Sequence, residues 1–359
     1  MARRIAVILV HYHTPELAAA AVAALVADAA ASGLAIEGIL VDNGSDEEGR
    51  ALLESLSFAR IDPGGNRGFA GGVNLGVAQA RAETIVVMNP DVRVLPGCLA
   101  ALADALAAGA AVAGPRFYWD AARRMVLPPA EERSRRAELL ALLATRGGGW
   151  AVRARRRWRR HARRHWEAER PLASYALSGG LLALTRAAWD VAGPFDEGFR
   201  LYFEETDWLR RAERAGLRAV YVPAAEAVHF HGRSAVQETR SAAWFTESAR
   251  RFRERHYGRW FADLLERLDR GLARRASEPL PALPEEGLDV RGYPLPVWVE
   301  VSPNPAGFPA AAERLAAAPA GGWRLSADVA ERLPAAELAV RVVDAGGRER
   351  ARAALRRAV

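Results

Sequence analysis

The chain has 359 residues, half of them apolar, and a formal net charge of +7 at pH 7. This length supports a sizeable buried core and about two domains. The longest apolar runs, such as 18–26, are too short and too rich in alanine to span a bilayer, and the single cysteine, Cys98, excludes an internal disulfide. The N-terminal residues show no secretory leader pattern, so we expect a cytoplasmic protein.

Residues 4–115 alternate between short β-branched runs and helical runs rich in alanine and leucine, which predicts strand-helix-strand units around a parallel sheet. In an open sheet of this kind ligands bind beyond the carboxyl ends of the strands, so polar residues there are candidate site residues. The expected strands are 5–12, 36–42, 58–62, 84–89 and 111–116, and the expected helices are 15–31, 46–56, 71–82 and 96–108.

Polar residues follow the second and third of these strands. Asp42, before Asn43 and Gly44, can accept hydrogen bonds from a pyrimidine ring or a ribose, although Asp-Asn-Gly is also an ordinary turn. Residues 64–74 form a glycine-rich loop that opens a helix. Its backbone N–H groups and Arg67 can hold a phosphate, and a flexible connector is the alternative.

The fourth strand delivers Asn89, Pro90 and Asp91 at its carboxyl end. A carboxylate held at a strand tip can bind a divalent metal through oxygen, and the metal then bridges a diphosphate. The same three residues also form a common turn.

An arginine-rich helical stretch occupies residues 120–170, and eight arginines fall between Arg153 and Arg164. Such a basic surface favours phosphates, acidic lipids or nucleic acid. Within it an apolar stripe recurs every four residues, at Ala154, Trp158, Ala162 and Trp166. This basic amphipathic helix either lies on an anionic membrane surface or packs its tryptophans on the protein itself.

Mixed structure returns at 172–232, and one or two amphipathic helices are expected at 241–275. A proline-rich linker follows. Alternating apolar residues at 297–301, 323–326 and 338–344 predict a small β-rich region.

The chain also carries a series of motifs at 41–45, 66–74, 89–91, 177–182, 193–197, 202–208, 214–216 and 228–234. In this order and spacing they resemble the family 2 glycosyltransferases, especially the rhamnosyltransferase-like branch. The resemblance covers about residues 4–260 and leaves the arginine-rich stretch and the last hundred residues outside its motifs.

The resemblance implies a GT-A type nucleotide-sugar transferase fold, an α/β fold whose mostly parallel Rossmann-like sheet has helices on both faces, with a small C-terminal β-rich region added. The expected domains are a transferase domain at 1–275, a linker at 276–296 and an accessory domain at 297–359. Within the first, we expect a donor half at 1–117, an arginine-rich insertion at 118–170, an acceptor and catalytic half at 171–240 and closing helices at 241–275.

By the same resemblance Asp42 contacts the nucleotide base, while Tyr12, Thr14 and Glu16 line its pocket. The cofactor is a divalent metal, Mg²⁺ or Mn²⁺. Asp91 supplies most of the charge for it because the motif's first residue is Asn89, where the family often has aspartate. His229 matches the family's late metal-ligand histidine, with His231 as the alternative. The other donor-binding positions are Asn43, Asn66, Arg67, Gly68, Asn74, Gly179 and Gly180.

An inverting transferase needs a base for the acceptor hydroxyl and a metal for the departing diphosphate. Where the family usually has Glu-Asp-x-Asp with the first aspartate as base, residues 204–207 read Glu-Glu-Thr-Asp. Glu205 therefore takes the position of the base, and Asp207 is the alternative.

The expected function is metal-dependent, inverting transfer of a sugar, rhamnose first, from a dTDP- or UDP-sugar to a hydroxyl of a saccharide or lipid-linked saccharide in cell-surface polysaccharide synthesis. An anionic membrane surface is a second expected partner, at the inner face of the membrane; nucleic acid is not expected. The alternatives are a nucleotidyltransferase and a non-catalytic carbohydrate- or lipid-binding protein on a transferase scaffold. The oligomeric state stays open.

Overall fold

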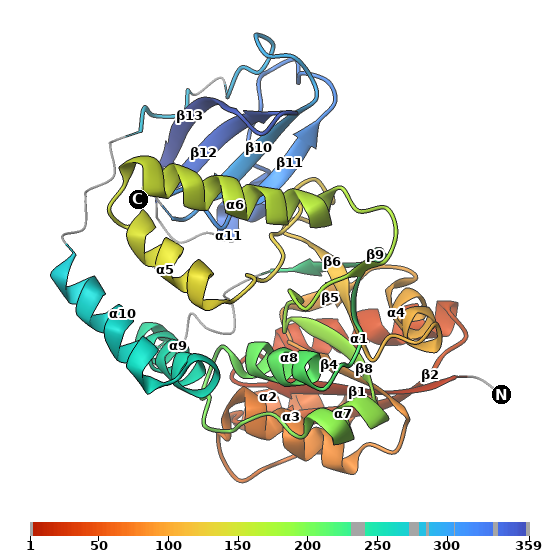
Figure 1. The fold of residues 1–359 in the computed structure, drawn as a ribbon. Helices are drawn as coiled ribbons and strands as arrows, with labels where there is room; N and C mark the ends of the chain where they lie inside the picture. Colours follow the sequence, from red (N-terminus) through yellow and green to blue (C-terminus); the bar gives the residue numbers. More distant parts are fainter. Residues whose placement is uncertain are drawn as a thin grey trace. The chain divides into compact units, whose positions relative to one another are not determined.

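The computed structural model describes residues 3–230, 241–272, 280–284, 287–304, 306–332 and 337–356. The chain folds as two compact units (Figure 1). Unit 1 comprises Met1–Arg116 and Ala168–Ala262, and unit 2 comprises Phe117–Glu167 and Asp263–Val359. The arginine-rich stretch and the C-terminal region therefore belong to the same unit, a division that differs from the boundaries expected from the sequence.

Unit 1 is built on a nine-stranded sheet in the order β3-β2-β1-β4-β8-β6-β9-β5, with β7 paired to β9. The four strands from β3 to β4 are parallel. Strand β8 is antiparallel to β4 and β6, and β9 is antiparallel to β5 and β7. The expected α/β class is confirmed. The strands are β1 (Arg4–His11), β2 (Ala35–Asp42), β3 (Ala59–Ile61), β4 (Thr84–Met88), β5 (Val92–Val94), β6 (Val112–Tyr118), β7 (Leu172–Ala173), β8 (Leu181–Thr185) and β9 (Ala219–His229).

Helices cover both faces of this sheet, which explains why β1 is apolar at nearly every position. Ala6, Ile8 and Val10 pack in one core cluster with residues of α3, α7 and α8. On the other side α1 contacts β2 and β5, and α4 contacts β8 and β9. The helices are α1 (Pro15–Ala31), α2 (Glu47–Glu54), α3 (Gly68–Gln79), α4 (Cys98–Ala107), α7 (Arg186–Ala192), α8 (Glu204–Arg214), α9 (Ser241–Tyr257) and α10 (Arg259–Gly271), the last crossing from unit 1 into unit 2.

Two glycines of α3 serve the packing of this helix on β1. A Cβ at Gly72 would lie 2.7 Å from a methyl carbon of Val10, and a Cβ at Gly76 would lie 2.6 Å from one of Ile8. Both distances are shorter than real carbon contacts, so only glycine allows the helix to approach the strand this closely. Part of the glycine richness near the predicted phosphate loop therefore has a packing cause.

Unit 2 contains a four-stranded antiparallel sheet in the order β11-β10-β12-β13. Of the three strands predicted here, two formed and 323–326 did not, because Trp323 makes only an isolated bridge with Leu288. The elements are β10 (Val297–Ser302), β11 (Ala311–Leu315), β12 (Glu337–Asp344), β13 (Glu349–Arg356), α5 (Arg135–Ala144), α6 (Gly148–Trp166) and α11 (Ala327–Arg332).

Helix α6 lies across this sheet (Figure 1), and its apolar stripe forms part of the core of unit 2. Trp158 and Trp166 are 7% and 5% exposed, and Trp166 stacks on Trp298 with ring centroids 5.2 Å apart. The two tryptophans thus pack on the protein itself. The alternative in which they lie in a membrane interface is wrong, because β10 and β12 cover them.

In the part of the chain that the structure describes, none of the helices combines the length and the hydropathy that crossing a membrane requires.

Candidate active site

A cavity of about 370 Å³ lies in unit 1, at the edge of the sheet where β1, β4 and β9 end and β8 begins. Three segments far apart in the sequence meet here because β1, β4 and β8 are neighbours in the sheet. The cavity therefore occupies the place that the strand-tip rule predicts. Ten of the residues predicted from the sequence line it: Tyr12, Asn43, Asn66, Gly68, Asn89, Asp91, Gly179, Gly180, Glu205 and His229.

Asp42 lies behind this lining and is buried in a hydrogen-bond network. Its Oδ1 accepts the Ser45 hydroxyl at 2.8 Å and the Gly44 N–H at 3.2 Å, and its Oδ2 lies 3.1 Å from Nη1 of Arg60. These donors match the capacity of an ionised carboxylate. The network fixes Asp42 at the end of β2, where its predicted contact with the base stays a prediction.

Thr14 supports the same network from behind instead of lining the cavity. Its N–H donates to Nδ1 of His11 at 3.2 Å, so Nε2 carries the ring proton and donates to Ser45 Oγ at 2.9 Å. Burial lowers the pKa of His11, which keeps this imidazole neutral. A chain of hydrogen bonds therefore runs from Thr14 through His11 and Ser45 to Asp42.

Asn43 ties the glycine-rich loop to the end of β2. Its Nδ2 donates to the carbonyl of Gly68 at 3.0 Å, and its Oδ1 accepts the N–H of Arg67 at 3.4 Å. Gly68 has φ +70°, and a Cβ there would lie 3.0 Å from the carbonyl oxygen of Arg200. These contacts tie the end of the loop, at residues 67–68, to Asn43 and to the backbone of Arg200. The Arg67 side chain is exposed and does not line the cavity.

Two residues that were predicted to bind the donor, Asn74 and Glu16, do not line the cavity. Asn74 joins α3 to the segment at 195–197: its Oδ1 accepts the N–H of Phe195 at 2.9 Å, and its Nδ2 donates to the Phe195 carbonyl and to Glu197 Oε1. Both ends of the amide are occupied by protein, so Asn74 is a structural bridge. Glu16 is exposed in the first turn of α1, outside the cavity.

Asp91 and His229 come together because β5 pairs with β9, in a register that places His229 opposite the residue after Asp91. Oδ1 of Asp91 lies 3.3 Å from Nε2 of His229, and both side chains are buried at the cavity wall. The neighbouring Asn89 is fixed by its N–H, which donates to the carbonyl of Gly180 at 2.9 Å.

This donor set fits Mg²⁺ or Mn²⁺. The Asp91 carboxylate is the kind of oxygen ligand that Mg²⁺ and Mn²⁺ prefer, and the cavity leaves coordination positions for diphosphate oxygens and water; the His229 imidazole adds a nitrogen ligand. Among the described residues no group of three or more His, Cys, Asp or Glu side chains could hold a metal ion. His231, the alternative ligand, lies outside the described residues.

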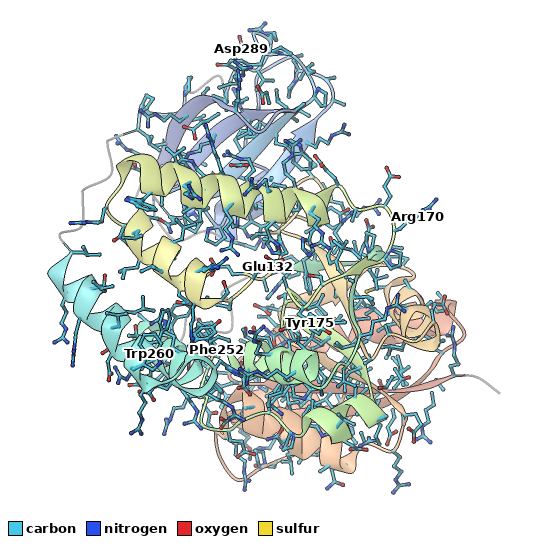
Figure 2. All side chains as sticks on the ribbon, viewed as in Figure 1. Glu132, Arg170, Tyr175, Phe252, Trp260 and Asp289 are labelled. Atoms are coloured by element: carbon cyan, nitrogen blue, oxygen red, sulfur yellow. The ribbon has the colours of Figure 1, made fainter. Side chains whose placement is uncertain are left out.

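The acidic pair enters the cavity from the first turn of α8. Tyr202 and Phe203, just before the helix, both adopt left-handed backbone conformations, with φ 68° and 71°. Such conformations are strained for residues with bulky side chains and persist only where packing enforces them. Phe203 is held by α9, 5.5 Å from the ring of Phe252, which is labelled in Figure 2. This turn directs Glu204 and Glu205 into the cavity.

The environments of the two glutamates differ. Burial, reinforced by the neighbouring Glu205 carboxylate, raises the pKa of Glu204 well above its usual range. Two adjacent carboxyl groups resist ionising together, and of the two Glu204 is the more deeply buried. Glu205 is half-buried and packs against Gly179, where a Cβ would lie 2.7 Å from Cγ of Glu205.

Asp207, the alternative base, does not line the cavity, and its carboxylate is held by one histidine and two arginines. Its oxygens lie 2.8 Å from Nε2 of His256, 2.9 Å from Nε of Arg211 and 3.1 Å from Nε of Arg255. Burial alone would raise the pKa of Asp207, but these partners outweigh it and hold the pKa below the usual range. An aspartate held this way is a weak base and an anchor between α8 and α9.

Besides Glu204, three cavity residues that bear on binding were missed by the sequence analysis. Arg200 is exposed, lines the cavity and makes no ion pair with any described residue, so it offers a cation to a phosphate. Tyr202 and Trp244 add aromatic surface of the kind that contacts sugars. Arg200 had no distinguishing signal in the sequence, and Trp244 looked like any apolar residue of an amphipathic helix.

Residues 6–157 match the family described as "Glycosyl transferase family 2". The N-acetylglucosaminyl-diphospho-decaprenol L-rhamnosyltransferase of two Mycobacterium tuberculosis strains is 31% identical over 263 residues, covering 66% of this chain and 81% of the relative. The low-salt glycan biosynthesis hexosyltransferase Agl10 of Haloferax volcanii is 37% identical over 67 residues, or 18% of this chain and 22% of that protein. Among solved structures, S. aureus TarS 1-349 superposes with a TM-score of 0.44 at 14% identity, covering 69% of this chain and 64% of that one, a likeness too weak to support a conclusion.

Proposed function

Because the chain belongs to glycosyl transferase family 2, and so is a glycosyltransferase, we propose that its unit 1 cavity binds a nucleotide diphosphate sugar and passes the sugar, with inversion, to an acceptor hydroxyl. The observation that carries the proposal is that Glu205, Asp91 and His229 line one cavity. A base and a pair of metal-ligating side chains thereby face the same bound substrate, which is what this reaction requires.

Glu205 takes the proton of the acceptor hydroxyl as that oxygen attacks the anomeric carbon. The raised pKa of the buried Glu204 favours its neutral form, which would add a hydrogen-bond donor beside the base instead of a second negative charge. Arg200 holds a phosphate oxygen of the donor at the cavity wall. Gly179 leaves room for the side chain of Glu205. This side chain is one methylene longer than the aspartate that the family usually has at the position of Glu205.

Asp91 and His229 are the residues that would hold Mg²⁺ or Mn²⁺. When bound, the metal supplies positive charge to the departing diphosphate. Both side chains are positioned by the sheet, since Asp91 follows the end of β4 and His229 is the last residue of β9. Their burial lowers the local dielectric, which strengthens the attraction between the bound cation and the phosphates.

The donor sugar and acceptor are proposed from the relatives. The mycobacterial relative, 31% identical, is named for transfer of L-rhamnose to N-acetylglucosaminyl-diphospho-decaprenol. We therefore propose rhamnose from a dTDP-sugar as the first donor to test, with a UDP-sugar second, and a lipid-linked saccharide of cell-surface polysaccharide synthesis as the acceptor. We propose that the nucleotide base binds beside the hydrogen-bond network around Asp42.

The test is release of nucleotide diphosphate from a panel of dTDP-, UDP- and GDP-sugars, with Mg²⁺, with Mn²⁺ and with EDTA. Asp91→Asn removes one charge from the proposed metal pair with almost no change in shape. Asp190→Asn is the matched control, because Asp190 is exposed on α7 outside the cavity. We expect metal-dependent release from one donor that Asp91→Asn lowers at least a hundredfold and Asp190→Asn leaves unchanged. Release that persists in EDTA would contradict the metal role.

A further inference from the structure

The arginines of α6 divide into two sets. Those facing the sheet are bonded to it: Arg159 makes a bidentate pair with the buried Glu300, at 2.5 and 2.7 Å, and Arg163 donates to the carbonyl of Ala345 at 2.7 Å. These bonds, with Trp158 and Trp166, fix the helix on unit 2. The inward set is therefore explained by folding alone.

The outward set has no such explanation. Arg153, Arg156 and Arg160 are exposed and make no ion pair or hydrogen bond with any described residue. From Leu139 to Trp166 the chain has nine arginines and no aspartate or glutamate. Exposed helices ordinarily intersperse both signs of charge, because like charges repel along one face. A surface that keeps its positive charges uncompensated suits an anionic partner.

Apolar side chains are exposed beside these charges. Leu139 of α5 and Trp150 and Val152 of α6 are 38%, 48% and 38% exposed, although each is large and hydrophobic. They lie on either side of the turn that joins the two helices at 145–147. Tryptophan and aliphatic residues next to arginines are the composition of surfaces that insert into the headgroup region of a bilayer.

A second cavity, of about 340 Å³, opens between the same two helices. Leu140, Trp158 and Phe308 give it an apolar lining, and Arg157, Arg160 and Arg164 stand along its wall at helical spacing. Glu132, labelled in Figure 2, also lines this cavity, and its carboxylate lies within 4.0 Å of side-chain nitrogens of Arg157 and His161. The combination of apolar lining and cationic wall matches a lipid, whose phosphate and hydrocarbon chain lie side by side.

We propose that the exposed face of the α5–α6 hairpin docks on an anionic phospholipid bilayer. Arg153, Arg156 and Arg160 lie over lipid phosphates, while Leu139, Trp150 and Val152 enter the interface. Docking goes beyond sugar transfer and uses none of the residues of the active site, so the two can fail separately. It would bring the enzyme to a surface where lipid-linked acceptors are found.

The experiment is co-flotation of the full chain with vesicles of phosphatidylcholine alone, of phosphatidylcholine with phosphatidylglycerol, and of phosphatidylcholine doped with a polyprenyl phosphate. We expect binding to the phosphatidylglycerol vesicles and not to phosphatidylcholine alone, weakening as salt rises. The triple variant Arg153→Gln, Arg156→Gln, Arg160→Gln should bind at least tenfold more weakly. Trp150→Ala should weaken binding while leaving its salt dependence unchanged, because it removes apolar contact and no charge.

The matched control replaces three exposed arginines elsewhere in unit 2, Arg314, Arg324 and Arg348, with glutamine. It removes the same net charge, so an equal loss of binding would show general attraction and overturn the proposal. Binding confined to the polyprenyl phosphate vesicles would overturn it in favour of recognition of a lipid carrier. Absence of vesicle binding by wild type would overturn it as well. Thermal melting checks that every variant is folded, and nucleotide diphosphate release with a water-soluble acceptor should be unchanged in the triple variant.

Discussion

Gly179→Ala is expected to slow sugar transfer by moving Glu205 without touching its chemistry. The backbone of Gly179 is outside the left-handed region, so alanine is tolerated there locally. The added methyl carbon, however, would lie 2.7, 3.0 and 3.2 Å from Cγ, Cδ and Cβ of Glu205, whereas ordinary contact begins near 3.4 Å. The Glu205 side chain must therefore shift by roughly 0.7 Å. Misplacing a catalytic group by about 1 Å costs roughly a hundredfold in rate.

We therefore expect kcat to fall between about tenfold and a hundredfold, which corresponds to roughly 1.4–2.7 kcal/mol of transition-state stabilisation. The dissociation constant of the donor, measured by calorimetry, should change much less than kcat, because the added methyl group at Gly179 points at Glu205 and the other donor-binding residues do not move. Gly149→Ala is the control, since a Cβ there meets nothing within 4 Å. A Gly179→Ala enzyme with wild-type kcat and an intact fold would refute the assignment of Glu205 as the base.

Three further substitutions test the surroundings of the site. The free energy of unfolding of wild type should decrease as pH rises through the raised pKa of Glu204, because the buried group must then ionise. Glu204→Gln should remove this pH dependence. The measurement is urea unfolding from acid to alkaline pH. Asp207→Asn should lower the free energy of unfolding by about 3 kcal/mol at neutral pH, since it leaves Arg211 and Arg255 without their carboxylate partner. Wild type should lose the same contribution as pH falls through the lowered pKa of Asp207. A variant as stable as wild type would contradict this role. Gly68→Ala should weaken donor binding about tenfold in calorimetry, because a left-handed alanine costs roughly 1–2 kcal/mol and its methyl group meets the Arg200 carbonyl; unchanged affinity would show that this loop does not hold the donor.

Much of the donor half of unit 1 could be predicted because local patterns determine it. The β-branched run before His11 and the proline at position 15 placed β1 and α1 within a residue of their observed bounds. By contrast β5 is only three residues long and too short for periodicity to show. The antiparallel pairing of β8 with β4 depends on a contact between segments about a hundred residues apart, for which the local pattern holds no signal.

In the candidate site, too, local patterns predicted some residues, while the roles of others depend on distant contacts. The end-of-strand rule found Asn43, Asn89 and Asp91, because the carboxyl ends of neighbouring parallel strands must meet. Asn74 and Asp207 look equally functional in the sequence, and only the structure shows that their side chains bond to distant parts of the protein and do not line the cavity. The partners of a polar side chain in the folded protein, which the local sequence does not show, separate a ligand-binding residue from a structural one.

The arginine-rich helix illustrates the same limit for surfaces. Its stripe of tryptophans fits a membrane and a protein core equally well, since both bury apolar area. The sheet that covers Trp158 and Trp166 begins at Val297, more than a hundred residues later in the chain. Once that contact is known, the exposed arginines and Trp150 become the residues that need an external partner.

The most direct test of the proposed mechanism is the rate of sugar transfer by Glu205→Gln at saturating donor and metal, measured beside donor binding by calorimetry. The substitution keeps the shape of the side chain and removes its ability to accept a proton. We expect donor affinity close to that of wild type and a transfer rate at least roughly a hundredfold lower, the usual contribution of a general base. A transfer rate close to that of wild type would show that another group activates the acceptor and would contradict the mechanism.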